Sequence, residues 1–162
     1  MNQQQGKINW RNLNVNRDRK YEHIVQKLVE DRDSGIFNFN KDLMVFAAMV
    51  GHCFNKKVSL SSDKIPITLG TYSSTEDDGF IYLLALMENR NAKCLKDQNI
   101  QESIKIFEEY CNGGLDLIND WFQSNPADLM KIETLEKKIL DQMYRNDKSN
   151  LKINNDDIDV DF

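Results

Sequence analysis

Two adjacent glycines, Gly113 and Gly114, lie inside a helical apolar pattern and limit how this chain can fold. Apolar residues at helical spacing precede the pair up to Tyr110 and resume at Leu115. Inside a helix each glycine costs about 1 kcal/mol relative to alanine. Either the helix breaks at the pair, or the backbone of another element packs directly against it. We predict a kink or a short interruption between two helical halves.

A second segment predicts the element at the centre of the fold. Residues 43–54 are almost all apolar or small, and Asn40 before them is a good N-cap for a helix. Within this segment Ala47, Ala48 and Gly51 form a smooth strip that another helix can approach closely. We therefore expect a central helix that is buried on most sides.

Apolar residues at helical spacing predict further helices over about 17–31, 80–87, 101 onward and 126–145. Asn125 and Pro126 mark the start of the last one, with proline at the first helical position. Between residues 58 and 68 apolar and polar side chains alternate, which is typical of a short hairpin, and Pro66 would keep one strand at an edge. The predicted fold class is all-α, with five to six helices and at most one small β-hairpin near residues 58–68.

Composition divides the chain into three parts. Residues 1–16 are rich in Asn and Gln and have few apolar anchors, so we expect a flexible N-terminal arm. Residues 17–146 contain no repeat or linker and are expected to form a single helical domain. Residues 147–162 hold five aspartates against two lysines and are expected to be an acidic flexible tail. Val160 and Phe162 are apolar for a solvating tail and favour a short docking motif there.

The overall composition favours a soluble protein of the cytoplasm. The sequence has no uninterrupted apolar run of the roughly 20 residues that a membrane-spanning helix needs. Its N-terminus lacks an apolar segment of signal-peptide length, and three cysteines at unrelated spacings fit a reducing compartment. A formal net charge of −5 argues against a protein that coats nucleic acid by bulk electrostatics, although a local basic patch survives this argument.

No residue pattern points to a reaction centre. The two histidines and three cysteines lack the paired spacing of zinc ligands, and Cys53 and Cys111 lie in apolar surroundings typical of small reduced core residues. Adjacent carboxylates such as Glu108 and Glu109 point about 100° apart on a helix, so such a pair does not converge on one magnesium ion. We predict no catalytic residue, no metal ligand and no cofactor, and we keep a small Mg-dependent nuclease as the second alternative.

The N-terminal part of the chain is basic. Residues 7–32 hold seven basic against four acidic side chains, and Trp10 nearby could stack on a base. The candidate contacts to DNA phosphates are Arg11, Arg17, Arg19 and Lys20. Two other interpretations stay open: the basic end docks on a partner or on the acidic tail, or it is ordinary solvated surface.

The segment IFEEYCNGGLDLI, residues 106–118, resembles the central motif of a family linked to Dnd systems, DNA phosphorothioation-associated protein four. The resemblance spans about residues 17–130, and Cys111 stands where the family usually has alanine. The motif serves either as a structural element or as a partner surface. Its residues in this chain are Glu108, Glu109, Tyr110, Asn112, Gly113 and Gly114.

The resemblance implies an accessory role beside bacterial systems that replace a non-bridging phosphate oxygen of DNA with sulfur and restrict invading DNA. It assigns no catalytic residue. From it we expect a non-catalytic accessory protein of this anti-phage defence that contacts other proteins of the system and, through its basic arm, duplex DNA. The first alternative is a DNA-binding transcriptional regulator of the same operon. A homo-oligomer is compatible with these functions, and no membrane partner is expected.

Overall fold

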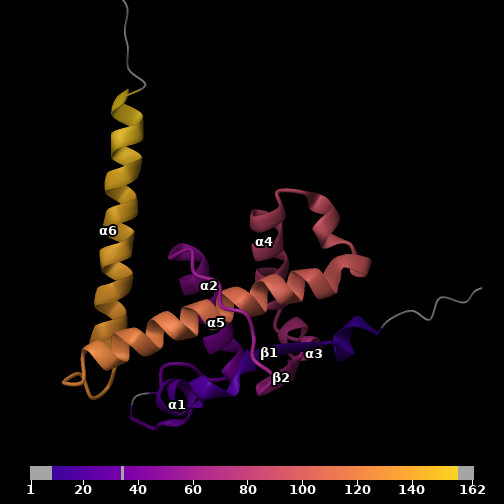
Figure 1. Cartoon of the computed structure of the whole chain (residues 1–162), viewed down its shortest axis with the longest axis horizontal. Coiled ribbons are helices and arrows are strands. Elements are labelled where there is room, and N and C mark those ends of the chain that lie inside the picture. The colour runs from indigo at the N-terminus through magenta and orange to yellow at the C-terminus, as the bar shows by residue number, and fades with distance from the viewer. Residues whose placement is uncertain (1–8, 34, 157–162) are drawn as a thin grey trace, which may run out of the picture. The chain divides into compact units, whose positions relative to one another are not determined.

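The structure is a computed structural model that describes residues 9–33 and 35–156, with side chains up to residue 147. Within these residues the fold is mainly helical, as predicted, with one two-stranded sheet (Figure 1). The elements are α1 (Glu22–Val25), α2 (Asn40–Cys53), α3 (Leu69–Ser73), α4 (Asp78–Asn89), α5 (Ile100–Ser124), α6 (Ile132–Asp156), β1 (Asn14–Asp18) and β2 (Lys64–Thr68). The chain divides into two compact units, Met1–Asp120 and Trp121–Phe162, which are described separately.

The sheet of the first unit joins segments that are far apart in the sequence. Strands β1 and β2 pair antiparallel, in a register that runs from Asn14 opposite Thr68 to Asp18 opposite Lys64. The predicted hairpin over 58–68 is therefore wrong in its pairing, because β2 takes its partner from the N-terminal segment. Strand β1 also includes residues 14–16, which we expected in the flexible arm.

The first predicted helix is shorter and less regular than its apolar pattern suggested. Residues 17 and 18 lie in β1, and a 3-10 turn, Arg19–Tyr21, leads into α1. A π-helical turn, Gln26–Glu30, then completes the segment. Ile24 and Leu28 are nonetheless fully buried, so the spacing predicted the correct inward face.

Helices α2 and α5 cross with their backbones in contact. Helix α5 is continuous through Gly113 and Gly114, so the predicted interruption is wrong and the other alternative, a second backbone packed against the pair, is confirmed. A Cβ added to Gly114 would lie 1.8 Å from the Ala47 carbonyl oxygen of α2. A Cβ added to Gly51 would lie 2.0 Å from a carbonyl oxygen of α5. The smooth strip of α2 and the glycine pair of α5 are therefore two sides of one contact.

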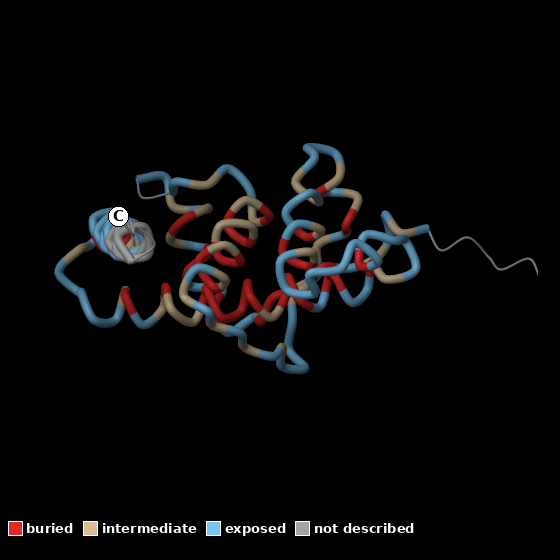
Figure 2. Tube along the Cα trace, turned by 90° about the horizontal axis from the view of Figure 1, so that it is seen from above, coloured by how far each residue is buried: buried red, intermediate tan, exposed pale blue. Residues whose placement is uncertain are grey.

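The hydrophobic core of the first unit surrounds this crossing. Figure 2 shows buried stretches in the helices of this unit, while the loops between them are mostly exposed. Every main helix of the unit contributes fully buried side chains, among them Ile24, Leu28, Leu43, Met44, Tyr72, Ile81, Leu84, Phe107, Leu115 and Ile118. No helix in the described residues is both long and apolar enough to cross a membrane.

The second unit contains the last turn of α5, a loop and α6. The predicted helix start at Pro126 is wrong, because residues 125–131 form a loop and α6 begins at Ile132. Asp128 explains this start: its carboxylate accepts hydrogen bonds from the backbone N–H groups of Lys131 at 2.9 Å and Thr134 at 2.8 Å. Since free N–H groups at a helix start favour such an acceptor, Asp128 caps α6. Helix α6 continues to Asp156, through part of the expected tail.

Candidate functional site

Side chains one helical turn apart on α5 hold strand β1. Glu108 Oε1 accepts hydrogen bonds from the backbone N–H and the side-chain amide of Asn16, both at 2.7 Å. One turn later, Asn112 Oδ1 accepts the backbone N–H of Asp18 at 3.1 Å. In this register the N–H groups of Asn16 and Asp18 point away from β2, because alternate residues of an antiparallel strand face its partner. Glu108 and Asn112 therefore occupy the open edge of β1.

The next turn of α5 binds the residues that follow β1. The Tyr21 hydroxyl donates to Asp116 Oδ1 at 3.0 Å, and Lys56 Nζ lies 2.7 Å from Asp116 Oδ2. A ring nitrogen of His23 lies 2.8 Å from Asn119 Oδ1. The hydrogen bond from Lys56 lowers the pKa of Asp116, whereas burial and the bond to Asp116 raise the pKa of Tyr21. Three turns of α5 thus hold one continuous N-terminal segment.

Arg17, one of the predicted DNA contacts, belongs to β1, and its side chain is buried. Its side chain is only 1% exposed, and Nη2 lies 2.7 Å from Glu22 Oε2 and 3.5 Å from Asn40 Oδ1. Arg17 Nε and Asn112 Nδ2 are buried without a hydrogen-bond partner among the described residues. In this conformation Arg17 cannot reach a phosphate outside the protein. A charge at this depth depends on its carboxylate partner for stability.

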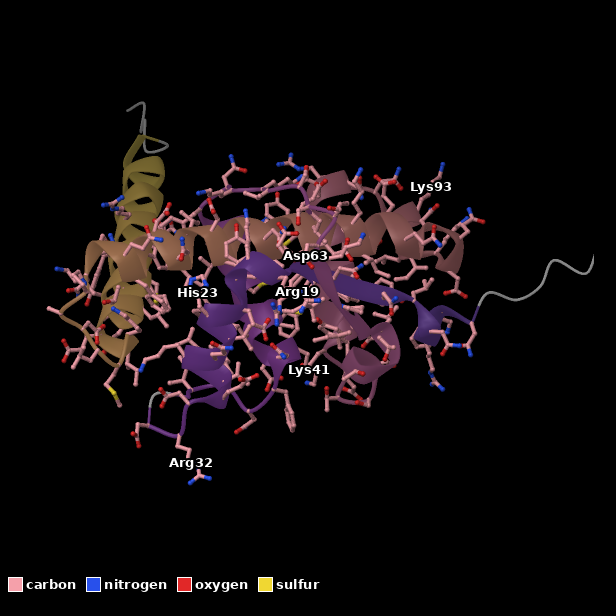
Figure 3. The ribbon with its side chains drawn as sticks, turned by 60° about the horizontal axis from the view of Figure 1, so that its bottom comes forward. Arg19, His23, Arg32, Lys41, Asp63 and Lys93 are labelled. Carbon is pink, nitrogen blue, oxygen red and sulfur yellow. The ribbon has the colours of Figure 1, made fainter. Side chains whose placement is uncertain are left out.

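The other predicted DNA contacts lie on the surface. Arg19 is exposed and forms an ion pair with Asp63 at 2.8 Å, and Figure 3 shows the two residues close together. Lys20 is exposed, with Nζ 4.7 Å from the centre of the Tyr21 ring. Arg11 is exposed as well, and its guanidinium lies 5.1 Å from the centre of the Trp10 ring. The structure therefore leaves Arg11, Arg19 and Lys20 accessible to a ligand.

The remaining motif residues bind other parts of the first unit. The Tyr110 hydroxyl donates to Glu88 Oε2 at 2.6 Å, and Lys57 pairs with the same carboxylate while lying over the Tyr110 ring. The hydrogen bond from Lys57 lowers the pKa of Glu88, and burial together with Glu88 raises the pKa of Tyr110 to about 12. The Glu109 carbonyl accepts the backbone N–H of Val58 at 3.0 Å. These contacts tie α5 to α4 and to the segment after α2.

The chemistry available at this site is hydrogen bonding and ion pairing. Burial raises the pKa of Glu108 even though Asn16 donates two hydrogen bonds to it. Among the described residues, no three His, Cys, Asp or Glu side chains are grouped so that they could hold a metal ion. Cys111 is buried, and burial raises the pKa of its thiol, which fits the predicted core role. Cys53 is exposed, so the same prediction for Cys53 is wrong.

A pocket of about 370 Å³ lies beside the start of α2. Lys41 Nζ is nearly buried there and pairs with Asp42 and with Asp77, so it joins the starts of α2 and α4. The hydrogen bond from Lys41 lowers the pKa of Asp77. The lining combines apolar groups with hydroxyls and consists of Phe39, Asn40, Lys41, Ile67, Thr71, Ser74 and Thr75.

Two groups of exposed apolar side chains were not predicted as surfaces. One lies on α4 and comprises Phe80, Leu83 and Met87; the other lies in the second unit and comprises Leu129, Met130, Ile132, Leu140, Met143 and Tyr144. The sequence held a signal for the first group, because residues 80–87 are almost all apolar, whereas a helix at the surface of a protein buries only one stripe. The predicted docking residues Val160 and Phe162 lie outside the described residues.

Comparison with known proteins identifies one family. No curated protein and no solved structure matches the chain. The family described as DNA sulphur modification system-associated protein 4 matches residues 14–156, from the first residue of β1 to the last residue of α6. This range includes the motif of α5 and the strand that the motif holds. The chain therefore belongs to the DNA sulphur modification system-associated protein 4 family.

Proposed function

We propose that this protein is a non-catalytic accessory of an anti-phage defence system linked to DNA sulphur modification, and that it acts by binding other proteins of that system. Its family supports the association with such a system. The side chains of Glu108, Tyr110 and Asn112 in the α5 motif are engaged in contacts within the first unit, which favours a partner site on another surface. The observation that favours protein binding is the exposed apolar surface of the second unit.

This docking surface comprises Leu129, Met130, Ile132, Leu140, Met143 and Tyr144. Leu129 is 77% exposed and Tyr144 is 66% exposed, although both are large enough to gain from burial. A hollow of about 450 Å³ at the start of α6 is lined in part by Leu129 and Ile132. Grouped apolar side chains of this kind mark protein interaction sites more often than scattered ones do.

The test is affinity capture of the tagged full chain co-expressed with the cloned modification and restriction proteins of its own system. We expect at least one of these proteins to be retained by the wild type. Because buried anchors carry most of the affinity of an interface, Leu129→Gln with Met143→Gln should reduce retention by about tenfold or more. Arg145→Gln, an exposed change on the opposite face of α6, should leave retention unchanged. Equal retention by both variants would contradict this assignment.

A contact with duplex DNA is the second candidate function. It is supported by the exposed Arg11 guanidinium beside the Trp10 ring, which can neutralise a phosphate of the duplex. In fluorescence anisotropy at low salt, Arg11→Ala and Lys20→Ala should each weaken binding to a labelled duplex, while Arg32→Ala, an exposed basic residue in another loop (Figure 3), should not. Arg17 is unsuitable for this test because it is buried.

The same assay separates the remaining alternatives. A transcriptional regulator should bind its own promoter more tightly than a random duplex of equal length. A nuclease should convert the duplex to shorter products when magnesium is added, and a single carboxylate substitution should abolish this. A non-catalytic accessory protein should show neither promoter preference nor cleavage. Cleavage by the purified chain would overturn the proposed accessory function.

A further inference from the structure

The outer edge of β2 presents backbone groups that can pair with a further strand. Residues 65 and 67 exchange hydrogen bonds with β1, so the backbone groups of Lys64, Pro66 and Thr68 point away from it. These three residues are exposed, and within the described part of the chain no third strand pairs with this edge. An extended peptide can add to such an edge through its own main chain.

The pocket beside the start of α2 lies next to this edge. Ile67 lines the pocket, whereas Val15, its partner on β1, is fully buried and does not. The pocket therefore opens on the side of Ile67 that faces away from β1. Ile65 and Ile67 are only half-buried, and Phe39 in the pocket lining is 62% exposed. An added strand would place every second side chain beside these apolar groups.

The C-terminal sequence of the chain has a pattern that fits this edge. Residues 157–162 read Asp-Ile-Asp-Val-Asp-Phe, so acidic and apolar side chains alternate without exception. An extended strand of this sequence has three apolar side chains on one face and three aspartates on the other. Against β2, the apolar face would meet Ile65, Ile67 and the pocket, while the acidic face would lie beside Lys64.

We propose that residues 157–162 of a second copy add to the outer edge of β2 as a third strand, with their apolar side chains toward the pocket. Chain length favours a second copy over the same chain. Only six residues follow the end of α6, and pairing along the five residues of β2 leaves almost no linker. In the same chain the end of α6 would have to lie at β2, a condition that a second copy does not impose.

Pro66 makes this edge selective. Proline has no N–H group, so an added strand gains one hydrogen bond fewer at the middle of the edge. Proline and lysine on edge strands suppress indiscriminate pairing, which leaves side chains to supply much of the affinity. Because one short strand forms a small interface, we expect binding in the micromolar range.

A labelled peptide of residues 154–162, titrated with the full chain in fluorescence anisotropy, tests the binding. The peptide should bind saturably. A second peptide in which Val160 and Asp161 are exchanged has the same composition and charge but breaks the alternation. It should bind about tenfold more weakly, because its apolar side chains no longer share one face.

Substitutions at Thr68 test the edge itself. The φ of Thr68 is −67°, which proline adopts, so Thr68→Pro removes the outward N–H without strain in the backbone. Thr68→Ala loses the same side-chain contact with Thr71 but keeps this N–H, so it is the matched control. We expect Thr68→Pro to bind the peptide about fivefold more weakly than Thr68→Ala, with equal helix content in far-UV circular dichroism.

Sedimentation velocity from about 1 to 100 μM tests the second copy. The 18.9 kDa wild type should gain mass as its concentration rises, and Val160→Asp with Phe162→Asp should stay monomeric. The docking surface of the second unit is intact in this variant, so the two proposals can fail separately. A wild type that stays monomeric would overturn the proposal, as would equal binding of the two peptides or equal affinity of the two Thr68 variants.

Discussion

The contact between α2 and α5 leads to a sharp prediction for Gly114→Ala. The added Cβ would lie 1.8 Å from the Ala47 carbonyl oxygen, whereas ordinary contact begins at 3.4 Å. The two helices must therefore separate by about 1.5 Å, and gaps of about 0.5–1 Å already forfeit a quarter to a half of a dispersion contact. Overpacking in cores costs about 1–3 kcal/mol, and here it should exceed the gain of about 1 kcal/mol that alanine brings to a helix. Because the added Cβ meets backbone, we take the upper end of that range, about 3 kcal/mol, and expect a net loss of about 2 kcal/mol in the free energy of unfolding.

Gly79→Ala is the matched control for this experiment. Gly79 lies in α4, and nothing is found within 4 Å of a Cβ added there. The same chemical change should therefore stabilise the protein, by up to about 1 kcal/mol. Urea unfolding followed by far-UV circular dichroism measures the free energy of unfolding of both variants, at a concentration where each is monomeric. If Gly114→Ala were as stable as the wild type, or if the two variants changed in the same direction, the close packing of α2 on α5 would be refuted.

Three further predictions concern single side chains that the structure places in buried or exposed environments. Arg17→Ala should lower the free energy of unfolding by about 3 kcal/mol, because it removes a fully buried side chain and leaves the partly buried Glu22 without its partner. Arg19→Ala, at an exposed pair, should change it by less than about 1 kcal/mol, and similar losses in urea would contradict the burial of Arg17. Burial raises the pKa of Glu108 above its ordinary 4.5, so the folded state binds this proton more tightly and loses stability as pH rises through the interval between the two values. Glu108→Gln should therefore gain stability relative to the wild type across that interval, and a constant difference in urea titrations would count against it. Cys53 should react with a thiol reagent in the native protein and Cys111 only after unfolding; equally fast reaction of both would refute their assigned environments.

The sequence predicted the helical fold where local spacing decides the structure. The smooth strip with Ala47 and Gly51 predicted a close helix approach, and a backbone packed against Gly113–Gly114 was one of the two alternatives for the glycine pair. Apolar spacing also identified the buried face of the first helical segment, including Ile24 and Leu28. In each case the information lies within about two helical turns, which is the range over which periodic patterns act.

Other features depend on partners that are distant in the sequence. Residues 14–16 of β1 were predicted in a polar arm and residues 17 and 18 in a helix, because the pairing of β1 with the distant β2 forms only when the chain is folded. Arg17 looked like a surface cation for the same reason, since its partners Glu22 and Asn40 gather around it only in the tertiary structure. The break at Gly113–Gly114 was predicted because helix propensity alone disfavours glycine, and close packing outweighed that cost.

The hydrogen bonds that α5 makes to the N-terminal segment indicate which surfaces of this protein are available for binding. Glu108, Asn112 and Asp116 are spaced four residues apart and each satisfies polar groups of the N-terminal segment. Leaving a buried donor without its acceptor costs about 1–3 kcal/mol, so each of these side chains is required by the fold itself. A residue held in this way is poorly placed to exchange its partner for a ligand. Binding functions are therefore better sought on surfaces that the fold leaves exposed, which here are the outer edge of β2 and the docking surface of the second unit.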